Sequence, residues 1–135
     1  MRRVTLSLLL ASVLVAEGVS AVEPSPVYIV SPRNGASLSS PVVVVFGLRN
    51  PWGVAPAGVK MDLTGHHHLL IDTAVPDLKL AIPKDDQHRH FGGGQTETTV
   101  ELRPGQHTLQ LLLGDFAHVP HAVPLMSEQI TITVE

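Results

Sequence analysis

Histidine is the residue type in this chain with the greatest potential for chemistry. The sequence holds eight histidines and no cysteine, and every histidine lies after Gly65. Most of them fall in two short clusters, His66-His67-His68 and His88-Arg89-His90, while His118 and His121 flank a Val-Pro pair. Neutral imidazole is a common ligand of zinc, copper and nickel. The pattern therefore favours a transition-metal site built from nitrogen and oxygen ligands.

The first cluster is predicted to lie on a strand, where successive side chains point to opposite faces. His66 and His68 then share a face with their Cβ atoms about 7 Å apart, close enough to bind one cation. His118 is the natural third ligand and His121 the next candidate. His67 points to the other face, where we expect a hydrogen-bonded, partly buried side chain.

The second cluster has the same spacing but lies among aspartates, directly before three glycines. His88 and His90 have two interpretations: a solvated loop, or a second ligand pair or lid over the first site. His107 follows a Pro-Gly-Gln turn at the start of a predicted strand. At such a corner of a β-sandwich, we expect His107 to bond back across the turn.

Short β-rich segments alternate with proline and glycine turns, and no segment has a convincing helical period. This pattern predicts an all-β fold, an immunoglobulin-like antiparallel β-sandwich of about seven strands. In such a fold the third and sixth strands are neighbours, which would bring the first histidine cluster close to the loop that carries His118. The expected strands are Val27–Val30, Val42–Leu48, His66–Asp72, Lys79–Ile82, Thr96–Leu102, His107–Leu113 and Gln129–Val134.

The N-terminus has the pattern of a secretory signal peptide. Arg2 and Arg3 precede the apolar segment Val4–Val15, and Val19-Ser20-Ala21 is a small-residue cleavage pattern. The apolar segment of about 12 residues is shorter than the roughly 20 that a membrane helix needs. We expect cleavage near Ala21 and a mature chain, residues 22–135, that is one domain, periplasmic or secreted, without a membrane span. An uncleaved anchor is the alternative.

Charge and motifs exclude several function classes. The formal net charge of −3 leaves no basic footprint for nucleic acid. The three glycines lack the Gly-Lys-Ser/Thr ending of a phosphate loop, and no Gly-x-Ser-x-Gly nucleophile motif occurs. We therefore expect no enzyme, with a three-histidine metal hydrolase as a minor alternative.

Four segments carry a resemblance to a known family. They are Thr64–Asp72 (TGHHHLLID), His90–Thr99 (HFGGGQTETT), Pro104–Asp115 (PGQHTLQLLLGD) and His118–His121 (HVPH). Together they resemble an uncharacterised family of small exported bacterial proteins, catalogued as a domain of unknown function, and the match covers nearly all of the mature chain. Some members are labelled rod shape-determining protein. That label implies a polytopic membrane protein, whereas this chain has only one short apolar segment.

A second, more distant resemblance concerns the spacing Gly-His-x-His-x-x-x-Asp, here Gly65 to Asp72, followed by a late His-x-Pro at His118. It is similar to a pattern in other exported immunoglobulin-like domains, some of them associated with copper. By analogy, the resemblance adds modest support to a metal site.

The expected function is the binding of one divalent transition metal in metal homeostasis or delivery, with copper first and zinc second because copper tops the affinity order. We expect Met126 as a soft supplement and Asp72 or Asp115 as a carboxylate that orients a ligand. The alternative is a metal-free envelope interaction module that binds a protein or glycan through its end loops. Apart from the metal ion, another periplasmic protein is a candidate partner. The expected ligands are His66, His68 and His118, and the wider candidate set adds His121, His88 and His90.

Overall fold

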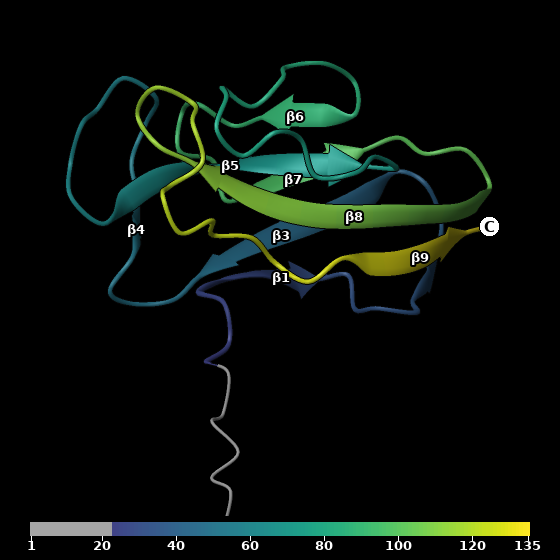
Figure 1. Cartoon of the computed structure of the whole chain (residues 1–135). Coiled ribbons are helices and arrows are strands. Elements are labelled where there is room, and N and C mark those ends of the chain that lie inside the picture. Colours follow the sequence, from purple (N-terminus) through teal and green to yellow (C-terminus); the bar gives the residue numbers. More distant parts are fainter. Residues whose placement is uncertain (1–22) are drawn as a thin grey trace, which may run out of the picture.

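The structure is a computed structural model, and it describes residues 23–135. The signal peptide predicted for residues 1–21 lies outside the described residues. The described part contains β-strands and turns and has no helix (Figure 1). Accordingly, none of its segments is a helix of the length and hydropathy that crossing a membrane requires.

The strands form two sheets that pack into a sandwich, which confirms the expected fold class. The smaller sheet has three strands in the order β1 (Val27–Ser31), β3 (Val42–Leu48) and β7 (Glu97–Val100). The larger sheet has six strands: β2 (Ser37–Leu38), β9 (Ile130–Val134), β8 (Gly105–Gly114), β5 (Thr64–Ile71) and β4 (Gly53–Val54) in that order, with β6 (His88–His90) also paired to β5.

The strand order is that of an immunoglobulin-like sandwich. In the described residues, seven strands remain when the two-residue strands β2 and β4 are set aside. The β1-β3-β7 sheet then corresponds to strands A, B and E, and β9-β8-β5 to G, F and C. The third and sixth expected strands, now β5 and β8, are antiparallel neighbours with His68 opposite Leu112. The two short strands pair in parallel, β2 with β9 and β4 with β5.

One predicted strand, Lys79–Ile82, is wrong, and two strands that were not predicted, β4 and β6, pair with β5. Residues Lys79–Ile82 form a turn and irregular backbone. The backbone amide of Ile82 donates to the carbonyl of His118 at 2.9 Å, and its side chain is buried, so this segment covers the sheet instead of extending it. The second histidine cluster, for which a loop was one interpretation, forms β6 (Figure 1).

The main core lies between the two sheets. Leu109, Leu111 and Leu113 point into it from β8, as do Ile130, Ile132 and Val134 from β9. A second apolar cluster lies on the outer face of the larger sheet, where Leu70 and Leu112 pack under the segments that join the strands. Its remaining members are Ile82, Leu78 and Met126. Strand β5 is therefore buried on both faces.

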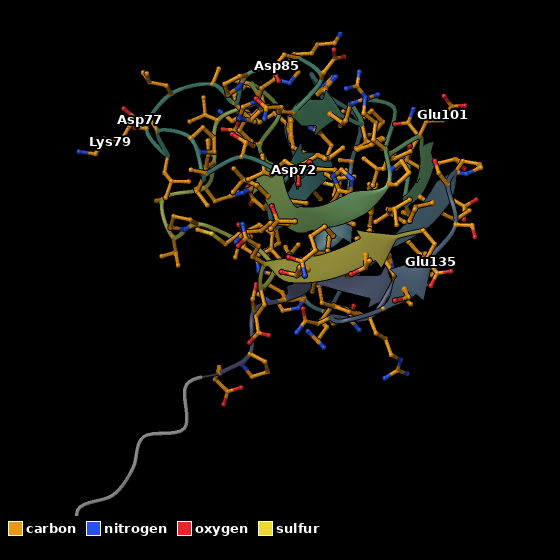
Figure 2. The ribbon with its side chains drawn as sticks, turned by 90° about the vertical axis from the view of Figure 1, so that its right-hand side faces the viewer. Asp72, Asp77, Lys79, Asp85, Glu101 and Glu135 are labelled. Atoms are coloured by element: carbon orange, nitrogen blue, oxygen red, sulfur yellow. The ribbon has the colours of Figure 1, made fainter. Side chains whose placement is uncertain are left out.

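The segment between β5 and β6 covers this outer face, and Figure 2 marks it by Asp77, Lys79 and Asp85 on the side of the molecule away from β1. Figure 1 shows the same arrangement, with β6 on one side of β5 and β3 and β1 on the other. The outward-facing side chains of β5 are thus covered by connecting segments, and not by the smaller sheet.

The corner role expected for His107 is confirmed. Its Nδ1 lies 2.7 Å from the Asp72 carboxylate and its Nε2 lies 2.7 Å from the Arg103 carbonyl. Both partners accept hydrogen bonds, so they favour the ring with both nitrogens protonated, and the hydrogen bond to Asp72 is the main cause that raises the pKa of His107. Asp72 also accepts from the backbone amide of Thr108 at 2.8 Å. Its carboxylate therefore serves this corner and does not orient a candidate metal ligand, contrary to our expectation.

Candidate metal centre

Four imidazoles converge on the outer face of the larger sheet. His66 and His68 come from β5, His90 comes from β6 and His118 comes from the segment between β8 and β9. One ring nitrogen from each of the four lies within 4.8 Å of the others. The ring centroids of His66 and His118 are 5.0 Å apart, and those of His68 and His90 are 5.1 Å apart. The arrangement could hold a metal ion.

Strand pairing explains how three of the four rings meet. His66 and His68 are two residues apart on β5 and share its outer face. His90 lies directly opposite His68 in the β5–β6 pair, and residues opposite one another in an antiparallel pair project to the same face. His90, which the sequence placed in a loop, lid or second ligand pair, thus joins the first pair.

Two glycines leave room for the rings. A Cβ atom on Gly114 would lie 2.7 Å from Cε1 of His68, and a Cβ atom on Gly92 would lie 2.3 Å from Cε1 of His90. Both distances are shorter than a carbon–carbon contact allows. A side chain at either position would therefore displace an imidazole from the cluster.

Asp115 shapes the loop that presents the fourth imidazole. Its carboxylate accepts from the backbone amides of Ala117 at 2.8 Å and Val119 at 3.0 Å. His118 then adopts a left-handed backbone with a φ of 68°, a conformation that is uncommon for a non-glycine residue and often found at functional sites. Asp115 therefore shapes the backbone that carries His118, and its carboxylate has no hydrogen bond to an imidazole, unlike the ligand-orienting role that we expected.

Four of the eight ring nitrogens in the cluster are buried without a hydrogen-bond partner. His66 and His68 are fully buried, with relative exposures of 0%. Nε2 of His66 lies 3.1 Å from Nδ1 of His118, whereas Nδ1 of His66, both nitrogens of His68 and Nε2 of His90 have no partner. Each such group costs roughly 1–3 kcal/mol when left unsatisfied. A cation at the centre would satisfy several of these lone pairs at once.

Burial also keeps the rings in the form that binds metals. It is the main cause that lowers the pKa of His66 from 6.5 to about 4 and that of His68 to about 3. The pKa of His90 is also lowered, first by burial and then by the neighbouring His118. Imidazole binds a metal through an unprotonated nitrogen, so these rings are ready to bind at neutral pH.

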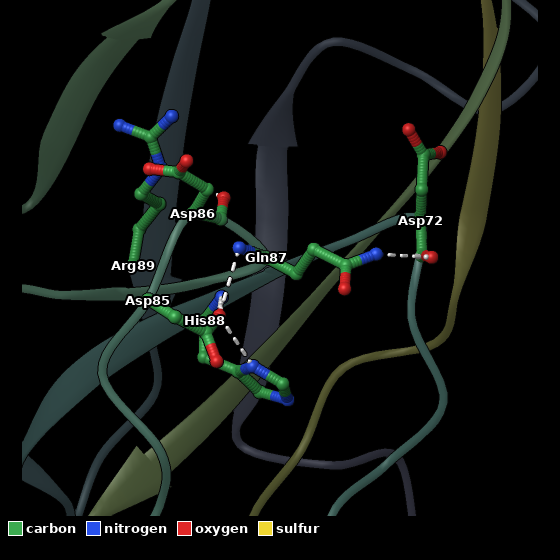
Figure 3. A network of polar contacts seen from close by, with 6 residues as sticks. All are labelled: Asp72, Asp85, Asp86, Gln87, His88 and Arg89. Carbon is green, nitrogen blue, oxygen red and sulfur yellow. Dashed lines mark hydrogen bonds and ion pairs between the residues drawn. The ribbon is translucent and has the colours of Figure 1, made fainter.

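The structure places the two remaining candidates outside the cluster. His121 directs Nε2 to the carbonyl oxygen of Thr64 at 3.0 Å and meets Trp52 edge-on, with 4.8 Å between ring centroids. His88 lies opposite Leu70, two residue pairs from the pair of His90 with His68, and its Nδ1 is 2.8 Å from the Asp85 carboxylate. Figure 3 shows the His88 ring turned toward Asp85, with Gln87 reaching the backbone oxygen of Asp72 nearby.

His67 does not have the environment that the sequence led us to expect. It is fully buried instead of partly buried, because the inner face of β5 packs against the smaller sheet. Its ring centroid lies 5.2 Å from that of Phe46, and neither ring nitrogen has a hydrogen-bond partner. Burial lowers its pKa to about 4.

The sulfur ligand that we expected as a supplement, Met126, packs against the second apolar cluster. The bridge between Leu112 and Met126 holds it beside β8. Apolar packing thus accounts for the position of Met126.

The comparisons with known proteins give a family and no activity. A family model described as "Domain of unknown function (DUF4399)" matches residues 44–135, which include β5, β6, β8 and all four clustered histidines. Searches of curated proteins and of solved structures returned no match. The matched region makes up more than half of the chain, so the chain belongs to the DUF4399 family of proteins with a domain of unknown function.

Proposed function

We propose that this chain is an exported, periplasmic protein that binds one divalent transition metal ion through His66, His68, His90 and His118. The observation that carries the proposal is the convergence of four ring nitrogens within 4.8 Å. The unpartnered nitrogens and the lowered pKa values of His66 and His68 support it, because these rings stay unprotonated at neutral pH and have nitrogens that no protein group occupies.

The spacing is compatible with a single ion. In a tetrahedral site with Zn–N bonds of about 2.1 Å, two ligand nitrogens lie about 3.4 Å apart. Nε2 of His66 and Nδ1 of His118 are 3.1 Å apart, close to this value, and the four nitrogens lie within 4.8 Å of one another, so the wider pairs would have to close on the ion.

Copper is the first choice of metal and zinc the second. All candidate ligands are imidazoles, and among divalent metals with such ligands copper binds most tightly. The physiological role we propose is metal homeostasis or delivery in the periplasm. The N-terminal Arg2-Arg3 and Val19-Ser20-Ala21 patterns support export.

Metal analysis of protein purified without an affinity tag tests the proposal. We expect one copper or zinc ion per chain after loading, with tight binding in titration calorimetry. His68→Ala should abolish tight binding, since it removes a fully buried ligand. His88→Ala is the matched control: it removes an imidazole from the neighbouring strand but outside the cluster.

If His68→Ala binds copper and zinc as tightly as the parent, the proposed site is wrong. The metal-free interaction module that binds a protein or glycan through its end loops then becomes the better account.

A further inference from the structure

The proposed ligand set carries no negative charge. Four neutral imidazoles around a divalent ion supply nothing that offsets its two positive charges. The Asp115 carboxylate, whose Oδ1 accepts two backbone hydrogen bonds within its own loop, acts on His66 electrostatically from outside the ligand set and offsets at most one of the two charges. A buried cation without a counter-charge is costly, so such a site favours an anion from outside as a further ligand.

A pocket of about 220 Å³ opens beside the cluster. It is lined by His90 and His118, together with Ala81, Ile82 and Lys84. The other two imidazoles are fully buried, and this pocket is lined by two of the four clustered rings, so it offers a ligand a route to the proposed metal. The backbone hydrogen bond from Ile82 to His118 fixes the wall of the pocket to the loop that carries a ligand.

The chemistry of the pocket wall fits a small organic anion. Lys84 supplies a positive charge, which also acts on His90. Ala81 and Ile82 supply the apolar part of the pocket lining. A short carboxylate combines a negative head with an apolar tail, and its head would meet the metal and Lys84 together.

We propose that the metal centre takes a small carboxylate as an exogenous ligand in this pocket, with Lys84 as the charged group that recruits it. This inference rests on the proposed metal site. The small carboxylate would be the ligand that completes the coordination of the metal at that site.

The test uses the copper-loaded protein and two small anions. The electron paramagnetic resonance and visible spectra are recorded first without anion, which reports on copper binding alone. Azide is then titrated as a spectroscopic probe, and acetate is added in competition. We expect a saturable spectral change with azide that acetate reverses.

Removing the charge separates recruitment by Lys84 from general attraction. We expect Lys84→Gln to weaken azide and acetate binding several-fold, because Lys84 would contact the bound anion directly, while copper affinity stays within about twofold, because the exposed charge acts on the metal only through solvent. Lys79→Gln is the control: it makes the same charge change on the same connecting segment, but Lys79 points away from the body of the protein beside Asp77 (Figure 2).

The outcomes are distinguishable. Failure of the parent to bind either copper or zinc removes the proposed function and this inference with it. Copper binding without any response to azide or acetate overturns the inference and leaves the metal site standing. Equal anion binding in Lys84→Gln and the parent overturns the role of Lys84.

Discussion

The two faces of β5 bury the same side chain in two different ways. On the outer face, His66 and His68 meet His90 and His118, and their nitrogens converge. On the inner face, His67 is equally buried but lies against the apolar ring of Phe46, with no other nitrogen to meet. Burial lowers the pKa of the imidazoles on both faces. The difference shows that convergence, and not burial or a lowered pKa, distinguishes a candidate metal site from a packed histidine.

The largest expected effect comes from removing an imidazole that only the fold brings into the cluster. His90→Ala should weaken copper binding by more than about 100-fold, because even residues outside the ligand set change metal affinity 10–100-fold. His121→Ala, which removes a histidine bound to Thr64 outside the cluster, should leave copper affinity unchanged. Titration calorimetry on both variants measures this contrast. Equal losses in the two variants would contradict the assignment of His90.

The metal-free protein should lose stability in acid. The pKa values of His66, His67 and His68 lie at about 4 or below in the folded state, against 6.5 in the unfolded chain. Between these values the unfolded chain binds more protons, so the free energy of unfolding decreases as pH falls from about 6.5 toward 4. Urea unfolding at pH 7, 6 and 5 measures it. A free energy of unfolding that is flat over this window would contradict the buried, neutral state of these rings.

Replacing the inner histidine should sharpen the comparison. His67→Leu should raise the free energy of unfolding by about 1–2 kcal/mol at pH 7, because it removes two unsatisfied buried nitrogens. The gain should grow by about 2 kcal/mol at pH 5, where the unfolded parent is protonated. Copper affinity should not change. A loss of copper binding in His67→Leu would mean that the inner face contributes to the site.

The smallest expected effect concerns the space around His90. Gly92→Ala would place a Cβ atom 2.3 Å from the His90 ring, and the ring can move away at little cost in stability. We expect copper affinity to fall about tenfold, while the midpoint of thermal unfolding of the metal-free protein changes little. Gly93→Ala is the matched control, since its Cβ atom would meet only the Gln95 side chain, at 3.1 Å. Indistinguishable copper affinities in the two variants would count against this positioning role.

The sequence predicted the parts of the site that depend on one strand or on neighbouring strands. Period-two alternation places His66 and His68 on one face, and the immunoglobulin-like pairing of β5 with β8 brings His118 close. The place of His90 in the cluster could not be predicted in this way, because its position opposite His68 depends on β6 pairing with β5 across a long connection. A strand of three residues leaves almost no signal in the sequence.

The environments of His67 and His88 could not be predicted from the sequence either. The inner position of His67 follows from which face of β5 meets Phe46, and the spacing of β5 alone is symmetric between its faces. The separation of His88 from the cluster depends on register, since it lies opposite Leu70 instead of His68. Both facts are set by tertiary packing and not by the local pattern.

Electron paramagnetic resonance of the protein loaded with one equivalent of Cu(II) tests the central claim most directly. Nitrogen hyperfine couplings give the number of imidazoles bound to copper. The parent measurement uses the full chain with all its native histidines. The account predicts one copper per chain with couplings from four imidazole nitrogens, reduced by one in His90→Ala and unchanged in His67→Leu. Copper bound with fewer imidazoles in the parent, or the same number of couplings in the parent and His90→Ala, would contradict it.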